Sequence, residues 1–238
     1  MKVSIIIPSY NQKKYVGEAV QSALDQSYPD KEIIIVDDCS TDGSYPFCQR
    51  YYGNANLIRH DRNQGLVATR NTALAAATGD LILPLDADDR LVPDYLEKTV
   101  PRMVEGVGVV STWMIMVVSP EMYDAGHRDQ FVGAPGSGWH IHTPTKEQIL
   151  QDNCLPTCSL IRKETLTDIG GWPKQFLRGS EDWALWAKIT TRGKWKIDVL
   201  PEYLFLYRVH KDSMSRSGAD KMAPRHEARE MIKEYCRG

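Results

Sequence analysis

Short apolar runs that alternate with amphipathic stretches constrain the fold of this chain more than any other feature. Val3–Ile7, Ile33–Val36 and Leu81–Leu85 are almost entirely apolar, as expected of parallel strands buried on both faces. Between them, Tyr15–Leu24 and Leu66–Ala77 place apolar residues along one helical stripe. Strands that alternate with helices at this spacing predict an α/β domain with a mostly parallel central sheet, Rossmann-like, flanked by helices.

Local signals predict further elements. Leu57–Ile58 reads as a short strand, and Gly79 is interpreted as closing the helix before it. Ser180 is the expected N-cap of a later helix, which Gly193 would end. In the second half we expect helices at 95–104, 146–151, 180–191 and 224–235, strands at 107–118, 157–161 and 203–209, and a surface loop at 133–144.

The overall composition excludes some classes of partner. Lys and Arg number 29 against 31 Asp and Glu, a formal net charge of −2, which gives no electrostatic reason to expect nucleic acid. Five scattered cysteines, an odd count, indicate reduced thiols in a cytoplasmic protein. No apolar run approaches the roughly 20 residues that span a bilayer. We therefore expect no transmembrane segment, and any membrane contact would be peripheral.

Acidic residues gather where two predicted buried strands end. Ile33–Val36 runs into Asp37 and Asp38, and Leu81–Leu85 runs into Asp86–Asp89. In open parallel sheets, ligands bind outside the carboxyl ends of the strands. Asp86 and Asp88 are expected to project to the same side of an extended segment. Hard oxygen ligands placed in this way suit Mg²⁺ or Mn²⁺, with a substrate diphosphate completing the coordination shell.

Three other classes of protein share parts of this pattern. A dinucleotide-binding dehydrogenase needs a glycine-rich turn after its first strand, but the residues after Pro8 contain no glycine before Gly17. An enzyme with an aspartyl nucleophile for phosphate transfer would carry threonine where Arg90 stands. A calcium loop needs glycine where the sequence has Leu91. All three classes fit less well than a nucleotide and metal site.

The motifs, taken in order, resemble a family 2 glycosyltransferase of GT-A fold, an inverting family. The resemblance covers residues 3–215 and rests on the order and spacing of several segments. These are Val3–Asn11, Val36–Ser44, Asn63–Gly65, Ala68–Asn71, Gly79–Asp80, Leu85–Asp89, Gly170–Trp172, Glu181–Trp183 and Tyr207–His210. It implies one domain over 1–238, with a nucleotide-sugar-binding half to about residue 92 and an acceptor-binding half over about 93–238.

The resemblance also implies roles for individual residues. Pro8, Tyr10 and Asn11 would line the nucleotide pocket, Asp38 would accept a hydrogen bond from uracil N3–H, and Arg70 would face the diphosphate. Asp86 would lie near the ribose or the metal, and Asp88 would be the principal ligand of Mn²⁺ or Mg²⁺. Asp89 could exchange roles with Asp88, and His210 matches an additional metal ligand of some members. Asp182 resembles the general base.

These residue types suit sugar transfer. The anomeric carbon passes through an oxocarbenium-like state, and a divalent cation stabilises the departing diphosphate of the donor, a UDP-sugar. One positioned carboxylate, Asp182, would take the proton of the acceptor hydroxyl, and attack opposite the leaving group inverts configuration. The acceptor would be a glycan or a lipid-linked glycan, as in polysaccharide biosynthesis.

Several alternatives stay open from the residues alone. Asp182 falls in the first turn of a helix, where a carboxylate also serves as a cap, and Glu181 competes for either role. His210 could be a structural histidine. The whole chain could be a catalytically inactive module that binds nucleotide sugars or glycans. A nucleotidyltransferase fits less well, because no glycine-rich phosphate loop follows the first strand.

Overall fold

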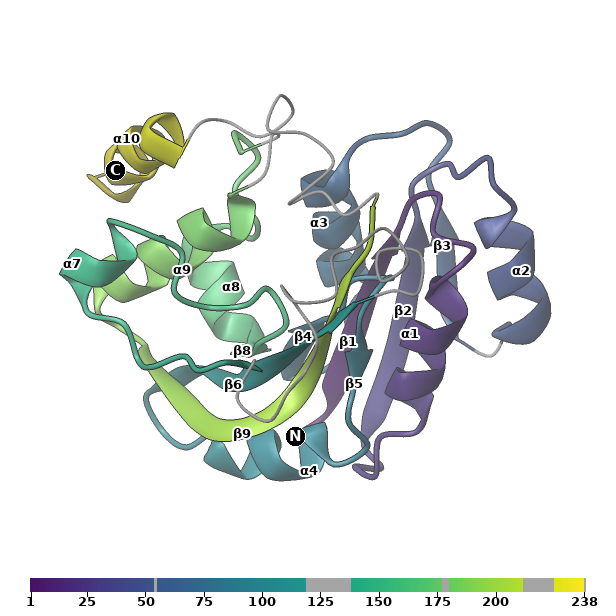
Figure 1. Ribbon diagram of the computed structural model, residues 1–238, viewed down its shortest axis with the longest axis horizontal. Coiled ribbons are helices and arrows are strands. Elements are labelled where there is room, and N and C mark those ends of the chain that lie inside the picture. The colour runs from purple at the N-terminus through teal and green to yellow at the C-terminus, as the bar shows by residue number, and fades with distance from the viewer. Residues whose placement is uncertain (54, 119–137, 177–179, 212–224, 238) are drawn as a thin grey trace.

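The computed structural model describes residues 1–53, 55–118, 138–176, 180–211 and 225–237. Over these residues, helices cover both faces of one curved, mixed sheet (Figure 1). The expected α/β class is confirmed. Among the described residues, no helix combines the length and the apolar character needed to cross a bilayer.

The sheet joins a parallel half to a mixed half. In the described chain it has nine strands, with the order β3-β2-β1-β4-β8-β6-β9-β5 and with β7 paired to β6. Their bounds are β1 (Val3–Ser9), β2 (Lys31–Asp37), β3 (Asn56–Arg59), β4 (Leu81–Pro84), β5 (Arg90–Leu91), β6 (Val107–Val118), β7 (Gly138–Trp139), β8 (Leu160–Arg162) and β9 (Lys196–Val209). β3, β2, β1 and β4 run parallel, whereas β8 is antiparallel to both of its neighbours.

This topology brings distant parts of the sequence to one edge. β1 pairs in parallel with β2 and β4, so Asp37 and the loop after Pro84 lie at the same end of the sheet. β8 is antiparallel to both β4 and β6, and β9 is parallel to β6. β9 therefore runs in the direction of β4. Its carboxyl end, followed by His210, lies at the edge that carries the acidic residues.

The helices bury one apolar core on each face of the sheet. Residues of α1 (Val16–Leu24), α2 (Ser44–Tyr51) and α4 (Tyr95–Thr99) belong to the first core. Residues of α3 (Leu66–Ala76), α7 (Lys146–Ile149), α8 (Lys163–Ile169), α9 (Glu181–Arg192) and α10 (Arg225–Arg237) belong to the second. Figure 1 shows α1 and α2 beside the parallel strands, and α7, α9 and α10 at the opposite end of the molecule.

Two expectations about helix ends were wrong. Gly79 does not close α3, because that helix ends at Ala76 and Ala77 is already extended. A Cβ on Gly79 would lie 2.7 Å from the backbone oxygen of Lys2, so close packing against β1 explains the glycine. Ser180 stands at the N-cap of α9 but has φ 67° and no capping hydrogen bond from its side chain.

Other element boundaries also differ. The helix expected over 95–104 is α4 followed by a 3₁₀ turn, η1 (Val100–Arg102). The expected strand at 157–161 is displaced to β8, and the strand expected at 203–209 begins earlier, at Lys196. Residues 133–137 of the loop expected at 133–144 fall outside the described residues, and Gly138–Trp139 form β7.

Candidate active site

The acidic segment after β4 is a turn rather than the extended segment we expected. The backbone N–H of Asp89 donates to the backbone carbonyl oxygen of Asp86 at 3.0 Å, which closes the turn. Asp86 and Asp88 consequently face different partners. Asp86 contacts an arginine of α3, whereas Asp88 contacts a histidine that follows β9.

Asp88 and His210 form a close pair. Asp88 Oδ2 lies 2.9 Å from His210 Nε2, and their side chains are 21% and 1% exposed. The imidazole also packs on the Tyr15 ring, with 4.7 Å between centroids. A carboxylate oxygen and an imidazole nitrogen, held at this distance by a loop and a strand end, are two donor groups suited to one divalent cation.

Asp89 has a different environment from Asp88. It is 3% exposed, and its Oδ1 accepts a hydrogen bond from the Arg208 N–H at 2.7 Å. Burial, together with the charges of Asp88 and Asp86, raises the pKa of Asp89 well above its ordinary value. The Arg208 guanidinium donates to the Asp88 backbone oxygen and to Glu18. Asp89 therefore fastens the turn to β9, and the geometry favours Asp88 over Asp89 as a metal ligand.

Arg70 joins two carboxylates from different parts of the chain. Its Nη2 donates to Asp86 at 2.7 Å and its Nη1 to Glu181 at 2.6 Å, and the side chain is 1% exposed. Burial disfavours the guanidinium charge, but the two carboxylates outweigh that effect and raise the pKa of Arg70. Burial in turn raises the pKa of Glu181 and of Asp86. Arg70 was expected to face the diphosphate; here it bridges α3, the β4 turn and α9.

Asp182 is held at the start of α9 by neutral donors. Its Oδ2 accepts from Asn153 Nδ2 at 3.0 Å and from Thr157 Oγ1 at 3.1 Å. Its Oδ1 accepts from the Trp183 N–H at 2.7 Å. The side chain is partly exposed, and its charge contributes to raising the pKa of Asp86. Asp182 thus lies at the same edge as the β4 turn with no basic side chain among these three donors.

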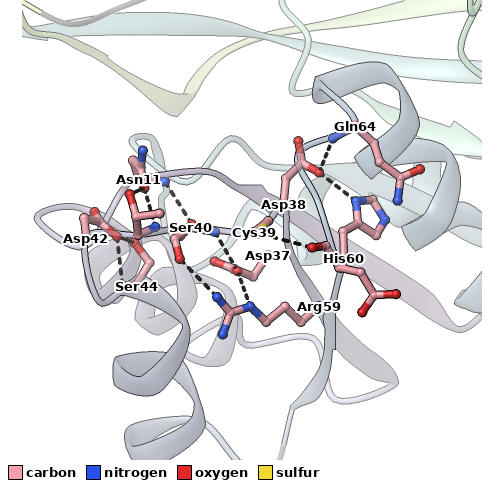
Figure 2. Close-up of polar contacts among 12 residues, drawn as sticks. Asn11, Asp37, Asp38, Cys39, Ser40, Asp42, Ser44, Arg59, His60 and Gln64 are labelled. Atoms are coloured by element: carbon pink, nitrogen blue, oxygen red, sulfur yellow. Dashed lines mark hydrogen bonds and ion pairs between the residues drawn. The ribbon is translucent and has the colours of Figure 1, made fainter.

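Asp38 occupies the centre of a loop network at the end of β2 (Figure 2). Its Oδ1 lies 2.7 Å from His60 Nδ1 and accepts from the Gln64 N–H at 2.8 Å, while its Oδ2 accepts from the Gly65 N–H at 2.8 Å. The residue is 2% exposed. A carboxylate offers about four lone-pair sites, and the contacts from described residues occupy three of them, which leaves one on Oδ2.

The expected nucleotide-pocket residues lie next to this network. Pro8 is buried within β1, whereas Tyr10 is 47% exposed and Asn11 is exposed with φ 53°. Asn11 Oδ1 accepts from the Thr41 N–H, and the Asn11 N–H donates to Ser40 Oγ, both at 2.9 Å. These bonds connect the loops after β1 and β2 and leave the Tyr10 ring open to solvent.

Sequence reasoning missed the residues that orient the acidic groups. His60 is buried, bonds Asp38 through Nδ1 and lies 2.9 Å from Thr72 Oγ1 through Nε2. Asn153 and Thr157 were likewise not singled out. Their positions carry no spacing signal, because the contacts with Asp182 span 29 and 25 residues of sequence. Only the fold brings them together.

The described residues contain no group of three or more His, Cys, Asp or Glu side chains arranged to hold a metal ion. The Asp88–His210 pair would supply two ligands, and the expectation was that a substrate diphosphate completes the coordination shell. The pair fits that expectation in the chemistry of its donor atoms. The residues that would hold a cation are therefore Asp88 and His210.

The model of the family described as glycosyl transferase family 2 matches residues 4–170. The chain belongs to glycosyl transferase family 2. This glycosyltransferase is 33% identical over 216 residues to TuaG of Bacillus subtilis (strain 168), a protein named for teichuronic acid biosynthesis, with 90% of this chain and 81% of the relative covered. It is 26% identical over 234 residues to the glycosyltransferase GlyG of Streptococcus pneumoniae serotype 4, covering 92% and 74% of the two chains.

Solved structures confirm the GT-A fold of this glycosyltransferase. Residues 1–349 of S. aureus TarS, in complex with UDP-GlcNAc, match with a TM-score of 0.74 at 24% identity over 99% of this chain and 66% of that one. The mannosyltransferase PcManGT of Pyrobaculum calidifontis, in complex with GDP-Man and Mn²⁺, matches with a TM-score of 0.67 at 23% identity. That match covers 90% of this chain and 58% of the mannosyltransferase.

Proposed function

We propose that this family 2 enzyme transfers a sugar from a UDP-sugar to an acceptor hydroxyl, with inversion and with a divalent cation. One observation carries the proposal. Arg70 bonds both Asp86, two residues before Asp88, and Glu181, the neighbour of Asp182. A single guanidinium thus ties the candidate metal ligands and the candidate base to one edge of the sheet.

Asp88 and His210 would hold the cation, Mn²⁺ or Mg²⁺, together with oxygens of the donor diphosphate. When bound, the cation would offset the negative charge that develops on the leaving diphosphate. Asp88 is 21% exposed and lies at the carboxyl end of a strand, where ligands of open sheets bind. Asp89 would hold the turn in place through its bond to Arg208.

Asp182 would act as the base. Its carboxylate would take the proton of the acceptor hydroxyl while the hydroxyl oxygen forms a bond to the anomeric carbon. The bond from that carbon to the phosphate oxygen breaks, and its electron pair leaves with the diphosphate. Attack from the face opposite the leaving group inverts configuration. Asn153 and Thr157, which donate to Oδ2, would orient the carboxylate before the acceptor binds.

Asp38 would accept a hydrogen bond from the uracil N3–H through its remaining lone pair on Oδ2. TarS binds UDP-GlcNAc and PcManGT binds GDP-Man. Both uracil and guanine have an N–H group that can donate a hydrogen bond to a carboxylate. Cytosine presents an acceptor at N3, so Asp38 would disfavour CDP-sugars by the cost of an unsatisfied polar group, about 1–3 kcal/mol.

Residues to about 92 would bind the donor, and residues from about 93 would bind a glycan or lipid-linked glycan acceptor in polysaccharide synthesis.

All five cysteines are free thiols, which supports a cytoplasmic location. Contact with a lipid-linked acceptor would then be peripheral to the membrane. The alternative, an inactive binding module, gives no catalytic role to the Asp88 and Asp182 carboxylates.

Calorimetry and donor turnover test the proposal together. Wild type is expected to bind UDP with Mn²⁺ and to hydrolyse its donor slowly to free UDP, whereas Asp88→Ala loses both turnover and the Mn²⁺ dependence of UDP binding. Asp89→Asn, in which the amide oxygen can still accept from Arg208, is the matched variant and keeps metal-dependent binding. Full activity of Asp88→Ala, or of wild type after exhaustive chelation, would refute the metal assignment. CDP binding as tightly as UDP would refute the role of Asp38.

A further inference from the structure

Three aromatic rings gather on the acceptor half of the sheet, on β6, just after β7 and on β9. The ring centroids of Trp113 and His140 lie 4.3 Å apart, those of Trp113 and Tyr203 5.3 Å, and those of His140 and Tyr203 5.5 Å. We call these three residues the aromatic cluster. The proposed transfer reaction leaves them without a role.

The cluster is held firmly but is not enclosed. Trp113 Nε1 donates to the Ile141 oxygen at 3.1 Å, and the His140 imidazole is hydrogen-bonded to the Tyr203 hydroxyl. A Cβ on Gly138 would lie 2.0 Å from Tyr203 Cε1, so the backbone of β7 packs directly on that ring. His140 is exposed, and Trp113 and Tyr203 are partly exposed.

The cluster lies on the face of the sheet that carries Asp182. Trp113 packs in the same core as Trp183 and the other buried residues of α9. Two residues before Trp113, Ser111 Oγ lies 2.8 Å from Ser159 Oγ on the neighbouring segment. Two residues before Ser159, Thr157 donates to the Asp182 carboxylate. Ser111, Ser159 and Thr157 therefore form a series of residues that runs from the aromatic cluster to the proposed base.

We propose that the aromatic cluster is the acceptor subsite, where a pyranose ring of the acceptor glycan stacks on Trp113 and His140. A pyranose has one face of C–H groups and a rim of hydroxyls. Partly exposed aromatic rings offer an apolar surface to that face, and the tips of His140 and Tyr203 offer hydrogen bonds to hydroxyls. This assignment rests on the proposed function, because it takes the acceptor to be a glycan.

Saturation-transfer NMR with methyl glycosides of glucose, galactose and N-acetylglucosamine, and with their disaccharides, tests the subsite directly in the presence of UDP and Mn²⁺. At least one glycoside is expected to bind wild type, and His140→Ala and Trp113→Ala to raise its Kd roughly tenfold, the loss expected for one aromatic stacking contact. Trp113→Phe, which keeps a ring, should recover most of the affinity. Tyr51→Ala removes a ring that is 60% exposed on α2 and is the control that should change nothing.

The outcomes separate the two proposals. The subsite is refuted if no glycoside binds wild type, or if binding survives in both His140→Ala and Trp113→Ala with the fold intact by circular dichroism. If glycosides bind in a cluster-dependent way while UDP and Mn²⁺ do not bind at all, the donor proposal fails and the subsite stands. If UDP binding alone survives in His140→Ala, the cluster recognises acceptor and not donor, as proposed.

Discussion

At the scale of single residues, the partners of each carboxylate distinguish roles that the sequence leaves open. Asp86 and Glu181 both pair with Arg70, and Asp89 accepts a hydrogen bond from the Arg208 N–H. Asp88 faces an imidazole, and Asp182 faces neutral donors. The sequence predicts that all five acidic residues belong to one site. It could not assign them, because these partners lie 16 to 122 residues away along the chain.

Asp182→Asn tests the base at this scale. We expect kcat to fall by roughly 10²–10⁴, the usual loss of a general base, while UDP affinity stays near wild type and Tm falls slightly, because an amide nitrogen in place of Oδ2 cannot accept from Asn153 and Thr157. The amide oxygen can still accept from the Trp183 N–H, so the start of α9 is preserved. Steady-state kinetics and thermal melting measure the two effects separately.

Glu181→Gln is the matched variant and should behave in the opposite way. It removes one of the two carboxylates that pair with a buried guanidinium, while Asp86 stays in place; we expect this to cost about 1–3 kcal/mol of stability, and the folded fraction keeps Asp182, the proposed base. If Glu181→Gln stops turnover at full stability while Asp182→Asn remains active, the base is Glu181. If neither variant lowers kcat, the base lies elsewhere.

Glu32→Gln tests a carboxylate far from the site. Burial disfavours the charged form of Glu32, but hydrogen bonds from Ser4, Lys2 and Thr78 outweigh it and lower its pKa to about 2. The ionised form of Glu32 is therefore more stable in the folded protein than in the unfolded chain. We expect Glu32→Gln to cost about 1–3 kcal/mol at neutral pH.

The pH dependence of that cost follows from the direction of the shift. The folded pKa lies below the ordinary value of 4.5, so the stabilisation is complete above pH 4.5 and disappears as pH falls toward 2. Urea unfolding of both proteins at about pH 7 and about pH 3 should show the difference shrinking. A difference that stays constant with pH would contradict this origin. Glu230→Gln, which removes an exposed pair with Lys233, should change little.

At the scale of elements, the apolar pattern predicted those with a continuous buried run or stripe. β1, β2, β4 and β6 and helices α1 and α3 are of this kind. It missed α2, where only Ser44 and Cys48 are buried, and it missed α8 and the two-residue β5. β9 begins seven residues before the predicted start, because its first half carries Lys196, Asp198 and Glu202 and is recognisable only by its pairing with β6.

Gly79→Ala tests the packing of the segment between α3 and β4. A Cβ there would meet backbone atoms of Lys2 and Ser4 at 2.7 and 2.8 Å, and backbone cannot move aside as a side chain can. We expect a loss of about 1–3 kcal/mol, typical of overpacking, in a denaturant unfolding curve. An unchanged free energy of unfolding in Gly79→Ala would show that the backbone of β1 shifts to accommodate the methyl group.

Gly106→Ala is the comparison for that variant. Gly106 has φ 78° and nothing within 4 Å of an added Cβ, so its cost comes from backbone conformation alone, about 1–2 kcal/mol. Gly79→Ala should therefore also perturb the amide NMR signals of β1, whereas Gly106→Ala should leave them in place.

At the scale of the whole molecule, one continuous sheet joins the two halves, and a core on each face crosses the boundary near residue 92. We expect a single cooperative unfolding transition, with equal calorimetric and van't Hoff enthalpies. Two resolved transitions in scanning calorimetry would show that the halves unfold independently. The sequence predicted the single domain, but the antiparallel strand β8 that joins its halves has only three residues and no distinctive pattern.

The Arg70 bridge has a consequence for how this enzyme can evolve. Among the described residues, Arg70 is the one cation that pairs with both Asp86 and Glu181, so losing it alone leaves the buried Glu181 carboxylate without its counter-charge. A lineage that replaces the arginine must pass through a destabilised intermediate or change its partners in the same step. Among descendants of a common ancestor, these three positions should therefore be inherited as a set and, where they differ, differ together.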